Sequence, residues 1–432
     1  MLGSQIFNAV MTALFLVCYA YQLFYIPVSL FGRVLDRRKK WDILVQDTNM
    51  AVGSDSSGNK VAVLICARNE EEVIGELIKS IRQQDYPAEL IKIFVAADNC
   101  TDKTADIARA HGAYVWERFS SDKIGKGYAL QFLLEKIDLS IGLDSLDSFL
   151  VLDADNLLEE NFITEISKTF ASGYDIVTSY RNSKNYGDNW ISAGYSLWFL
   201  RESRFLNDAR MRLGTSCAVS GTGFMFSREV LRACDGWNFH LLTEDIEFSV
   251  KNILDGRKIG YCRTAVLYDE QPVTLKQSWH QRLRWAKGYL QVFGKYGKEL
   301  VSGIGRSEFA CFDMTMAIMP AILLTLVGSI VNYFTTMAAL AAGESATVIA
   351  MAAVSNILRV YGGLWLIGAI TTVSEWRSIH ASTAQKIIYS FTFPLFMLTY
   401  IPISITAIFR RVEWKPITHK KAVNLAQLRR NA

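Results

Sequence analysis

The stretch Lys60-Val-Ala-Val-Leu-Ile-Cys66 decides the fold, because its run of aliphatic and β-branched residues predicts a buried strand. An amphipathic helix follows it, with apolar residues at positions 73, 74, 77, 78 and 81. A further strand, helix and strand are expected at 91–96, 104–110 and 113–116. Alternating strands and helices predict an α/β domain with a parallel sheet, whose ligands bind beyond the carboxyl ends of the strands.

Acidic residues stand where two of the strands end. Asp98 opens a loop that runs to Asp102, and the same loop equally suits the capping of the next helix. The apolar run Phe149-Leu-Val-Leu leads directly into Asp153 and Asp155. Two carboxylates one residue apart provide the hard oxygen ligands that Mg²⁺ or Mn²⁺ prefers, and such a cation can also hold a diphosphate.

Four further segments carry chemistry. Gly125-Lys126-Gly127 allows a lysine to approach a phosphate, and the small residues of Ser220-Gly-Thr-Gly223 allow a substrate to pass close to the backbone. Thr243-Glu-Asp245 precedes a helical run. Thr243 and Glu244 would also be suitable caps for the N-terminus of that helix. Trp279-His-Gln-Arg-Leu-Arg-Trp285 lies on a basic, aromatic helix that is typical of a membrane surface.

Taken in order, these segments resemble the membrane-embedded, inverting family 2 glycosyltransferases, which include cellulose, chitin and hyaluronan synthases. The likeness covers about residues 60–300, and its specific part is the pair Thr-Glu-Asp245 and Gln281-x-x-Arg284-Trp285. The resemblance implies a GT-A type α/β domain with a mixed, mainly parallel sheet flanked by helices. It also implies a UDP-sugar donor, a glycan acceptor and a divalent cation, Mg²⁺ or Mn²⁺.

The resemblance further implies a role for each matching residue. Asp245 would be the general base, with Glu244 and Arg284 beside it. The donor would contact Arg68, Glu70, Asp98, Lys126, Asp153, Gln281 and Arg284, and Asp155 would bind the metal. The acceptor would lie against Trp285, Gly221, Thr222 and Gly223.

Two positions depart from the family pattern. Ala97 precedes Asp98 where a second aspartate is common, and Cys66-Ala67 stands where a proline is common. The expected uridine contacts are therefore less complete than in the family.

Apolar segments frame the α/β region. Residues 1–32 contain no charged side chain, and a basic cluster beginning at Arg33 follows them, which predicts an anchor with its N-terminus outside. Residues 314–343, 346–374 and 387–409 are also long and apolar. Four spans would place the basic C-terminus outside, so three spans and one interfacial or re-entrant helix are expected, with four spans as the alternative.

The expected organisation has six parts. They are an N-terminal transmembrane anchor and basic flank (1–40), a cytoplasmic GT-A catalytic domain (41–275), amphipathic interface helices (276–308), two transmembrane helices (309–374), an interfacial or re-entrant helix (375–411) and a cytoplasmic tail (412–432). The tail looks like the gating loop of cellulose synthases, with Trp414, Thr418 and His419 as its candidates; a plain basic tail on anionic lipid is the alternative. Arg359 would either line a channel or pair with a neighbouring helix.

Composition narrows the partners. Half of the 432 residues are hydrophobic, which fits a lipid bilayer as a partner, and the net charge of +4 says little by itself. No nucleic acid is expected as a partner. The seven cysteines never stand in CxxC spacing, which fits a reducing compartment without a zinc site. Location in the plasma (inner) membrane follows, and association into a homo-oligomer stays open.

The leading expectation is a processive synthase that transfers sugar, preferably from UDP-glucose, to a growing β-glucan with β-1,4 or mixed β-1,3/1,4 linkages and exports the chain. One alternative is a chitin- or hyaluronan-type synthase that uses UDP-N-acetylglucosamine. Another is a non-processive transferase that adds one sugar to a lipid-linked acceptor. A catalytically silent binding subunit is disfavoured because Asp153, Asp155 and Asp245 are all present.

Overall fold

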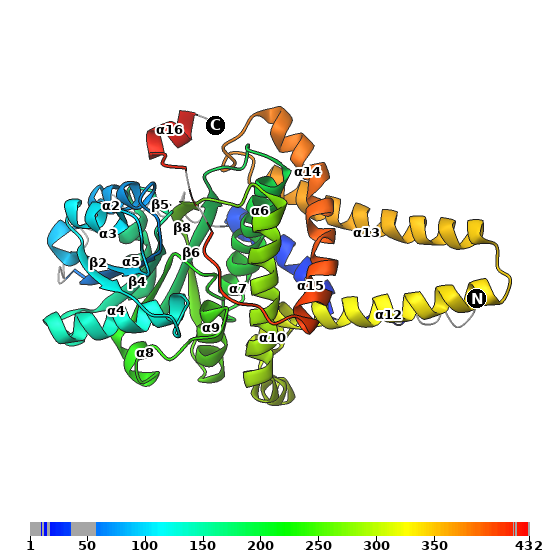
Figure 1. Ribbon diagram of the computed structural model, residues 1–432, viewed down its shortest axis with the longest axis horizontal. Coiled ribbons are helices and arrows are strands. Elements are labelled where there is room, and N and C mark those ends of the chain that lie inside the picture. The colour runs from blue at the N-terminus through cyan, green and yellow to red at the C-terminus, as the bar shows by residue number, and fades with distance from the viewer. Residues whose placement is uncertain are drawn as a thin grey trace.

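The computed structural model describes residues 10, 13–14, 18–35, 58–417, 419 and 421–430. A sheet covered by helices forms one part of the molecule, and a long helical hairpin projects away from it (Figure 1). Between the two lie the long helix α10 (Leu275–Gly305) and the stacked helices α14 (Thr383–Leu398) and α15 (Tyr400–Phe409).

The central sheet has eight strands in the order β3-β2-β1-β4-β7-β6-β8-β5. Strands β1, β2, β3 and β4 pair in parallel, as do β6 and β8, while β7 and β5 run antiparallel to their neighbours. The bounds are β1 (Val61–Ala67), β2 (Ile91–Asp98), β3 (Tyr114–Arg118), β4 (Ser148–Asp153), β5 (Leu157–Leu158), β6 (Ile176–Ser183), β7 (Phe224–Ser227) and β8 (Ile259–Asp269). The predicted mixed, mainly parallel α/β sheet is confirmed.

Helices cover both faces of this sheet. The first helices are α2 (Ile74–Arg82), α3 (Thr104–Ala110), α4 (Lys126–Ile141) and α5 (Phe162–Ala171). Leu77 and Ile78 of α2 pack with Val63 and Ile93 on one face, whereas Leu130 of α4 packs on the other face. Because parallel strands are buried on both faces, β1 reads as a continuous apolar run.

The second half of the domain adds α6 (Trp190–Arg201), a π-helical segment (Glu202–Asn207), α7 (Asp208–Arg212), α8 (Arg228–Ala233) and α9 (Glu244–Leu254). Helix α10 packs against α9 on one side and α15 on the other, and α14 packs against α6. The segment expected as several interface helices is therefore one continuous helix, α10.

The apolar segments form helices. Residues 18–35 are helical, and α11 (Phe309–Ile318), α12 (Pro320–Ala341) and α13 (Ala346–Ser374) follow α10. The apolar stretch 314–343 is divided at Met319, because Pro320 begins the next helix and cannot donate the hydrogen bond that would continue α11. The C-terminal α16 (Leu425–Arg430) lies back on the sheet domain.

Two helical segments among the described residues are long and apolar enough to cross a bilayer, Ala346–Ser374 and Thr383–Phe409. Shorter apolar helices cover Phe309–Ile318 and Leu326–Ala341. Residues 1–9, 11–12 and 15–17 of the N-terminal segment 1–32 lie outside the described residues. Its described end is fixed to the domain, because Tyr21 and Tyr25 donate hydrogen bonds to the buried Asp313 (2.7 and 3.1 Å).

Candidate active site

The carboxyl end of β4 carries the first part of the site. Lys126, at the start of α4, donates from Nζ to Asp153 and to the carbonyl oxygen of Gly221 (2.7 Å). The backbone amide of Asp153 donates to Thr222 Oγ1 (2.9 Å), so the Ser220–Gly223 loop is tied to the end of β4. Three segments that are far apart in the sequence thus meet here, as the sheet topology predicts.

Two glycines allow the loop to lie this close. Gly221 and Gly223 have φ values of +81° and +66°, which side chains rarely adopt. A methyl group added at Gly223 would lie 2.1 Å from a side-chain carbon of Leu267, whereas one at Gly221 would lie 3.8 Å from Asp245 Oδ2. Gly223 is therefore needed for packing, and Gly221 lies against the proposed base.

Asp245 and Glu244 begin α9, where the helix dipole favours negative charge. Glu244 is buried and Asp245 is partly exposed. Arg284 of α10 donates to the carbonyl oxygen of Leu242 at 2.9 Å, directly before the acidic pair. The expected base and its expected arginine neighbour therefore lie at one point of contact between α9 and α10.

The charges at this point influence one another. Burial and the neighbouring Asp245 raise the pKa of Glu244 to about 7, and the surrounding protein also raises the pKa of Asp245. Burial opposes the charge of Lys126, but Asp153 and Glu244 outweigh it and raise the pKa of the ammonium. A carboxylate with a raised pKa is a better proton acceptor, which suits a general base.

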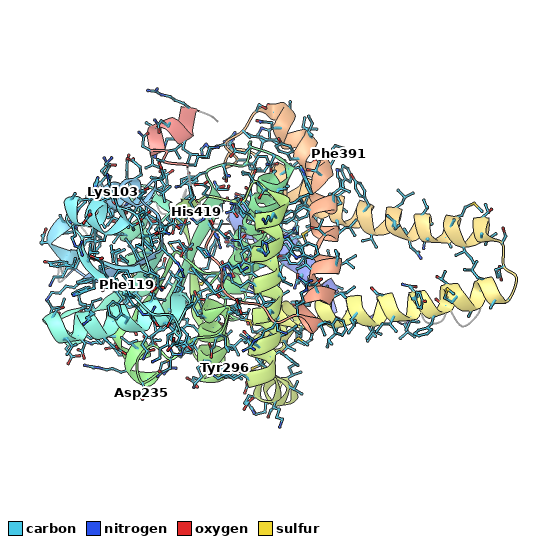
Figure 2. All side chains as sticks on the ribbon, in the orientation of Figure 1. Lys103, Phe119, Asp235, Tyr296, Phe391 and His419 are labelled. Atoms are coloured by element: carbon cyan, nitrogen blue, oxygen red, sulfur yellow. The ribbon has the colours of Figure 1, made fainter. Side chains whose placement is uncertain are left out.

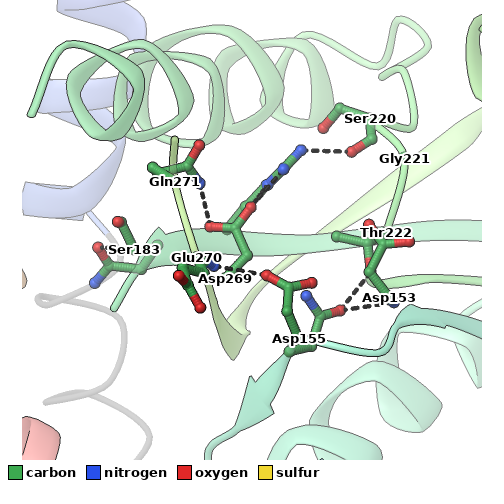
Figure 3. Close-up of polar contacts among 12 residues, drawn as sticks. Asp153, Asp155, Ser183, Ser220, Gly221, Thr222, Asp269, Glu270 and Gln271 are labelled. Atoms are coloured by element: carbon green, nitrogen blue, oxygen red, sulfur yellow. Dashed lines mark hydrogen bonds and ion pairs between the residues drawn. The ribbon is translucent and has the colours of Figure 1, made fainter. Parts of the chain in front are cut away.

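Asp155 lies deeper, with 4% of its surface exposed. Its Oδ2 accepts the backbone amide of Glu270 at 2.7 Å, just past the end of β8 (Figure 3). Although burial favours protonation, the nearby His419 and Lys184 keep the pKa of Asp155 below its usual value. Asp155 is therefore a carboxylate held among positive charges.

The site offers two carboxylates to a divalent cation, Asp153 and Asp155. Within the described residues, no three His, Cys, Asp or Glu side chains converge to hold a metal by themselves. Mg²⁺ is usually bound by one or two carboxylates together with substrate phosphates and water, so the residues present fit such an ion in company with a diphosphate.

Sequence reasoning missed a buried ion pair between β6 and β8. Arg181 donates from Nε to Asp269 (2.6 Å) and from Nη1 to the carbonyl oxygen of Ser220 (2.8 Å). Gln271 also donates to Asp269 (Figure 3). Arg181 lies 3.6 Å over the ring of Phe199. The signal was available, because the strand 259–269 ends in Asp269-Glu270 much as β4 ends in Asp153.

The C-terminal tail passes over the same edge of the sheet. His419 contacts Glu70 through Nδ1 (2.9 and 3.1 Å), and Arg68 lies 5.4 Å over the ring of Trp414. The backbone amide of Lys421 donates to Glu270 at 2.8 Å. Figure 2 shows His419 over the middle of the catalytic domain, far in sequence from its partners.

Contacts farther along hold this tail, residues 412–430, in place. Leu425 and Leu428 of α16 pack against Leu157 and Tyr268 of β5 and β8, and Arg429 pairs with Glu159. Burial lowers the pKa of His419, but Asp155 and Glu70 outweigh it and raise that pKa to about 10. His419 is therefore a cation at neutral pH, placed among the carboxylates of the donor side.

Other expected residues lie in varied positions. Asp98 is buried in an ion pair with Arg118. Gln281 Oε1 is buried without a hydrogen-bond partner among the described residues. Trp285 contacts Tyr195 and Phe199 edge to face, so part of its ring is already covered.

One candidate lies away from the other site residues, and another is outside the described residues. Arg359 is exposed on α13, 3.5 Å from Asn356 of the same helix, and thus lies on the projecting hairpin. Thr418 lies outside the described residues. The roles predicted for both stay predictions.

The chain belongs to a family of sugar-transferring enzymes: residues 58–288 match the model described as "Glycosyltransferase like family 2". Its α/β domain therefore has the class of fold expected of such enzymes. A solved mannosyltransferase of Pyrobaculum calidifontis has the same fold, with a TM-score of 0.55 and 16% identity over 93% of this chain and 98% of that chain.

Two curated relatives illustrate the range of the family. The beta-monoglucosyldiacylglycerol synthase of Nostoc is 27% identical over 276 residues, which are 60% of this chain and 56% of the relative. The poly-beta-1,6-N-acetyl-D-glucosamine synthase of Staphylococcus epidermidis is 22% identical over 53% of this chain and 54% of the relative. The chain thus spans about half the length of these relatives, and neither likeness specifically supports β-glucan, UDP-glucose or processive synthesis.

Proposed function

We propose that the chain is a membrane-bound, inverting glycosyltransferase that moves a sugar from a UDP-sugar to a lipid-borne acceptor. The observation that carries the proposal is the meeting of Asp245, Gly221, Lys126 and Asp153 at one edge of the sheet. A proton acceptor on one side and a cation on the other are what a single displacement at the anomeric carbon requires.

In this reaction Asp245 removes the proton of an acceptor hydroxyl that lies along Gly221. The hydroxyl oxygen forms a bond to the anomeric carbon as the bond from that carbon to the diphosphate breaks, so UDP leaves with the electron pair. Lys126 and Arg284 stabilise the negative charge that grows on the leaving group. Glu70 and Asp98 would hold the nucleoside end of the donor.

A divalent cation, Mg²⁺ or Mn²⁺, would be held by Asp155 with Asp153 and would supply positive charge to the diphosphate. Arg181 and Asp269 fix the ends of β6 and β8 beside these carboxylates. Their role is to position the site rather than to touch the reacting atoms.

The membrane placement is also part of the proposal. Helices α12 and α13 extend together away from the domain, as a spanning hairpin would (Figure 1). Helices α14 and α15 lie across this hairpin and against α6 and α10. Arg282 fixes them, since it donates to the carbonyl oxygen of Phe396 (3.0 Å) and to Thr399 (2.7 Å). We therefore place 383–409 in the interface, although its length and composition would also permit a span.

A lipid-borne acceptor is favoured because α9, which begins with Glu244 and Asp245, packs against α10, and α10 in turn packs against the interfacial helix α15. The name of the Nostoc relative, a glucosyldiacylglycerol synthase, supports this class of acceptor. A second candidate is extension of a growing glycan. It is favoured by Trp285, whose partly covered ring can still present a face to a sugar.

The test is product analysis with the full-length chain in bilayer discs. UDP-glucose, UDP-N-acetylglucosamine and UDP-galactose, each radiolabelled, are supplied with diacylglycerol or without it. Lipid-extractable products that carry one sugar support the proposal, while products of high molecular weight made without added lipid favour the second candidate. Absence of transfer from all donors, with Asp245→Asn as background, would contradict both.

A further inference from the structure

A second cavity lies behind the proposed active site, on the opposite face of the same two strands. Successive residues of a strand point to opposite faces. Arg181 of β6 points to Asp269 in the active site, whereas Tyr180 and Asn182 line this second cavity. The cavity has a volume of about 860 Å³, and residues of α5, β8, the N-terminal helix and the loop 375–380 complete its wall.

The wall of this cavity is rich in positive charge. Arg33, Arg263 and Arg377 line it, and so does His380, whose pKa is lowered by burial, so that it is a neutral hydrogen-bonding group at neutral pH. Among the described residues, Arg263 and Arg377 have no hydrogen-bond or ion-pair partner. Arg33 Nε and His380 Nδ1 are buried atoms that likewise lack a hydrogen-bond partner in the described part of the chain.

The acidic residues of the wall are already engaged. Glu375 is 2% exposed, accepts a hydrogen bond from Tyr180 (2.6 Å) and pairs with Arg204 (3.0 Å) and Arg33 (3.3 Å). Glu165 accepts a hydrogen bond from Thr264 (2.6 Å). The guanidinium groups of Arg263 and Arg377 thus remain available to an anion from outside the chain.

The position of this cavity points to the membrane surface. Glu375 directly follows α13, and Arg33 directly follows an apolar segment without charged residues. If these helices cross the bilayer as proposed above, the cavity lies at the depth of the lipid headgroups. Arginine is the side chain best suited to bind phosphate, because its planar group donates two parallel hydrogen bonds.

We propose that the cavity lined by Arg33, Arg263, Arg377 and His380 binds a phosphate group, supplied by the headgroup of an anionic phospholipid. The volume exceeds that of a lone phosphate and leaves room for the glycerol end of a lipid. Inorganic phosphate shares the chemistry and is the other source to be tested. This inference rests on the proposed membrane placement but not on the proposed reaction.

The test uses the full-length chain in a neutral detergent. Binding of short-chain phosphatidic acid, short-chain phosphatidylcholine and inorganic phosphate is measured by native mass spectrometry and by the shift in melting temperature. The variant is Arg263→Gln/Arg377→Gln, which removes no hydrogen bond or ion pair among the described residues. The matched control is Arg410→Gln/Arg411→Gln, which removes two exposed arginines next to apolar α15, away from the cavity.

We expect one tightly held phosphatidic acid per chain and no comparable binding of phosphatidylcholine. The cavity variant should bind phosphatidic acid about tenfold more weakly, the loss expected for charge-assisted hydrogen bonds, and the control should bind as the wild type does. Competition by inorganic phosphate at equal concentration would support the phosphate site and assign a soluble ligand. Equal weakening in both variants would overturn the proposal, as would equal binding of both lipids.

The outcome is independent of sugar transfer. The Asp245→Asn chain should bind phosphatidic acid as the wild type does, because Asp245 is not among the residues that line the cavity. A chain that binds the lipid yet transfers no sugar would refute the proposed function alone. A chain that transfers sugar but shows no preference for phosphatidic acid would refute this inference alone.

Discussion

The candidate site lies along the carboxyl ends of the strands, here called the sheet edge, and its two halves differ. The first half is formed by β1, β2 and β4, and the second half by β6, β8 and the C-terminal tail. In the first half, β1, β2 and β4 each end in residues that short sequence patterns identify, such as Glu70, Asp98 and Asp153. In the second half, β6 and β8 bring together Arg181 and Asp269, 88 residues apart, and the tail adds His419, 349 residues from Glu70. The first half supplies local motifs, whereas the second depends on long-range packing.

The difference bears on function. The first half and α9 supply the groups that would touch the reacting atoms, and the second half supplies charges that hold the loop of Ser220 and cover the donor side. Variants in the first half should therefore change turnover, while variants in the second half should change stability or donor affinity.

The largest effect is expected at Asp245. Asp245→Asn keeps the size of the side chain but cannot accept the proton, so kcat should fall by about 10³-fold, within the range of general-base catalysis. Initial rates with saturating UDP-sugar, together with UDP binding by calorimetry, measure the split between kcat and affinity.

Its control is Asp106→Asn, an exposed aspartate of α3 that should leave kcat unchanged. A residual rate within tenfold of the wild type would remove Asp245 from the role of base. Loss of UDP binding in parallel with kcat would instead indicate a damaged fold.

The next largest effect concerns the buried pair of the second half. Arg181→Met leaves Asp269 as an unpaired buried carboxylate, which typically destabilises a protein by about 3–5 kcal/mol. The double variant Arg181→Met/Asp269→Leu removes both charges and should recover much of that stability. Melting temperature in detergent measures both variants.

Activity should not return with stability in the double variant, because the carbonyl oxygen of Ser220 also loses its hydrogen bond from Arg181. Recovery of full activity would show that the pair serves folding alone. In that case the second half of the sheet edge would contribute to stability alone, and only the first half to activity.

The sequence predicted more of the first half of the sheet edge than of the second half. The parallel pairing of the first strands and the place of Asp98 and Asp153 at strand ends follow from alternation and strand ends, whereas the contact of Lys126 with Asp153 was not predicted. The pair of Arg181 and Asp269 was missed because Arg181 stands inside a strand, where no local pattern marks it. The cover that His419 provides rested on resemblance, since a tail's position over a sheet is set by tertiary packing.

A smaller effect is expected at His419. His419→Gln removes a cation next to Glu70 and Asp155, so the tail should hold the donor less firmly. The KM for UDP-sugar should therefore rise about tenfold, the scale of one charge-assisted hydrogen bond. The kcat at saturating donor should change little. Lys415→Gln, an exposed position on the same tail, is the matched control; a similar change of KM in the control would assign the effect to general charge.

The smallest effect is a dependence of donor affinity on pH. Burial raises the pKa of Glu70 to about 7, against the opposing effect of His419, whose own pKa is raised to about 10. Both groups are charged between these two values, so the ion pair should be lost as pH falls below about 7, when Glu70 is protonated, and as pH rises above about 10, when His419 loses its proton. Since a single partly exposed pair contributes at most about 1 kcal/mol, the KM should rise about two- to fivefold as the pH falls through the acid limb.

Steady-state KM values between pH 6 and 8 measure this dependence, with His419→Gln as the comparison. The variant should lose the part of the dependence that comes from the pair, and an identical acid limb in both proteins would show that another carboxyl, such as Glu244, controls the affinity.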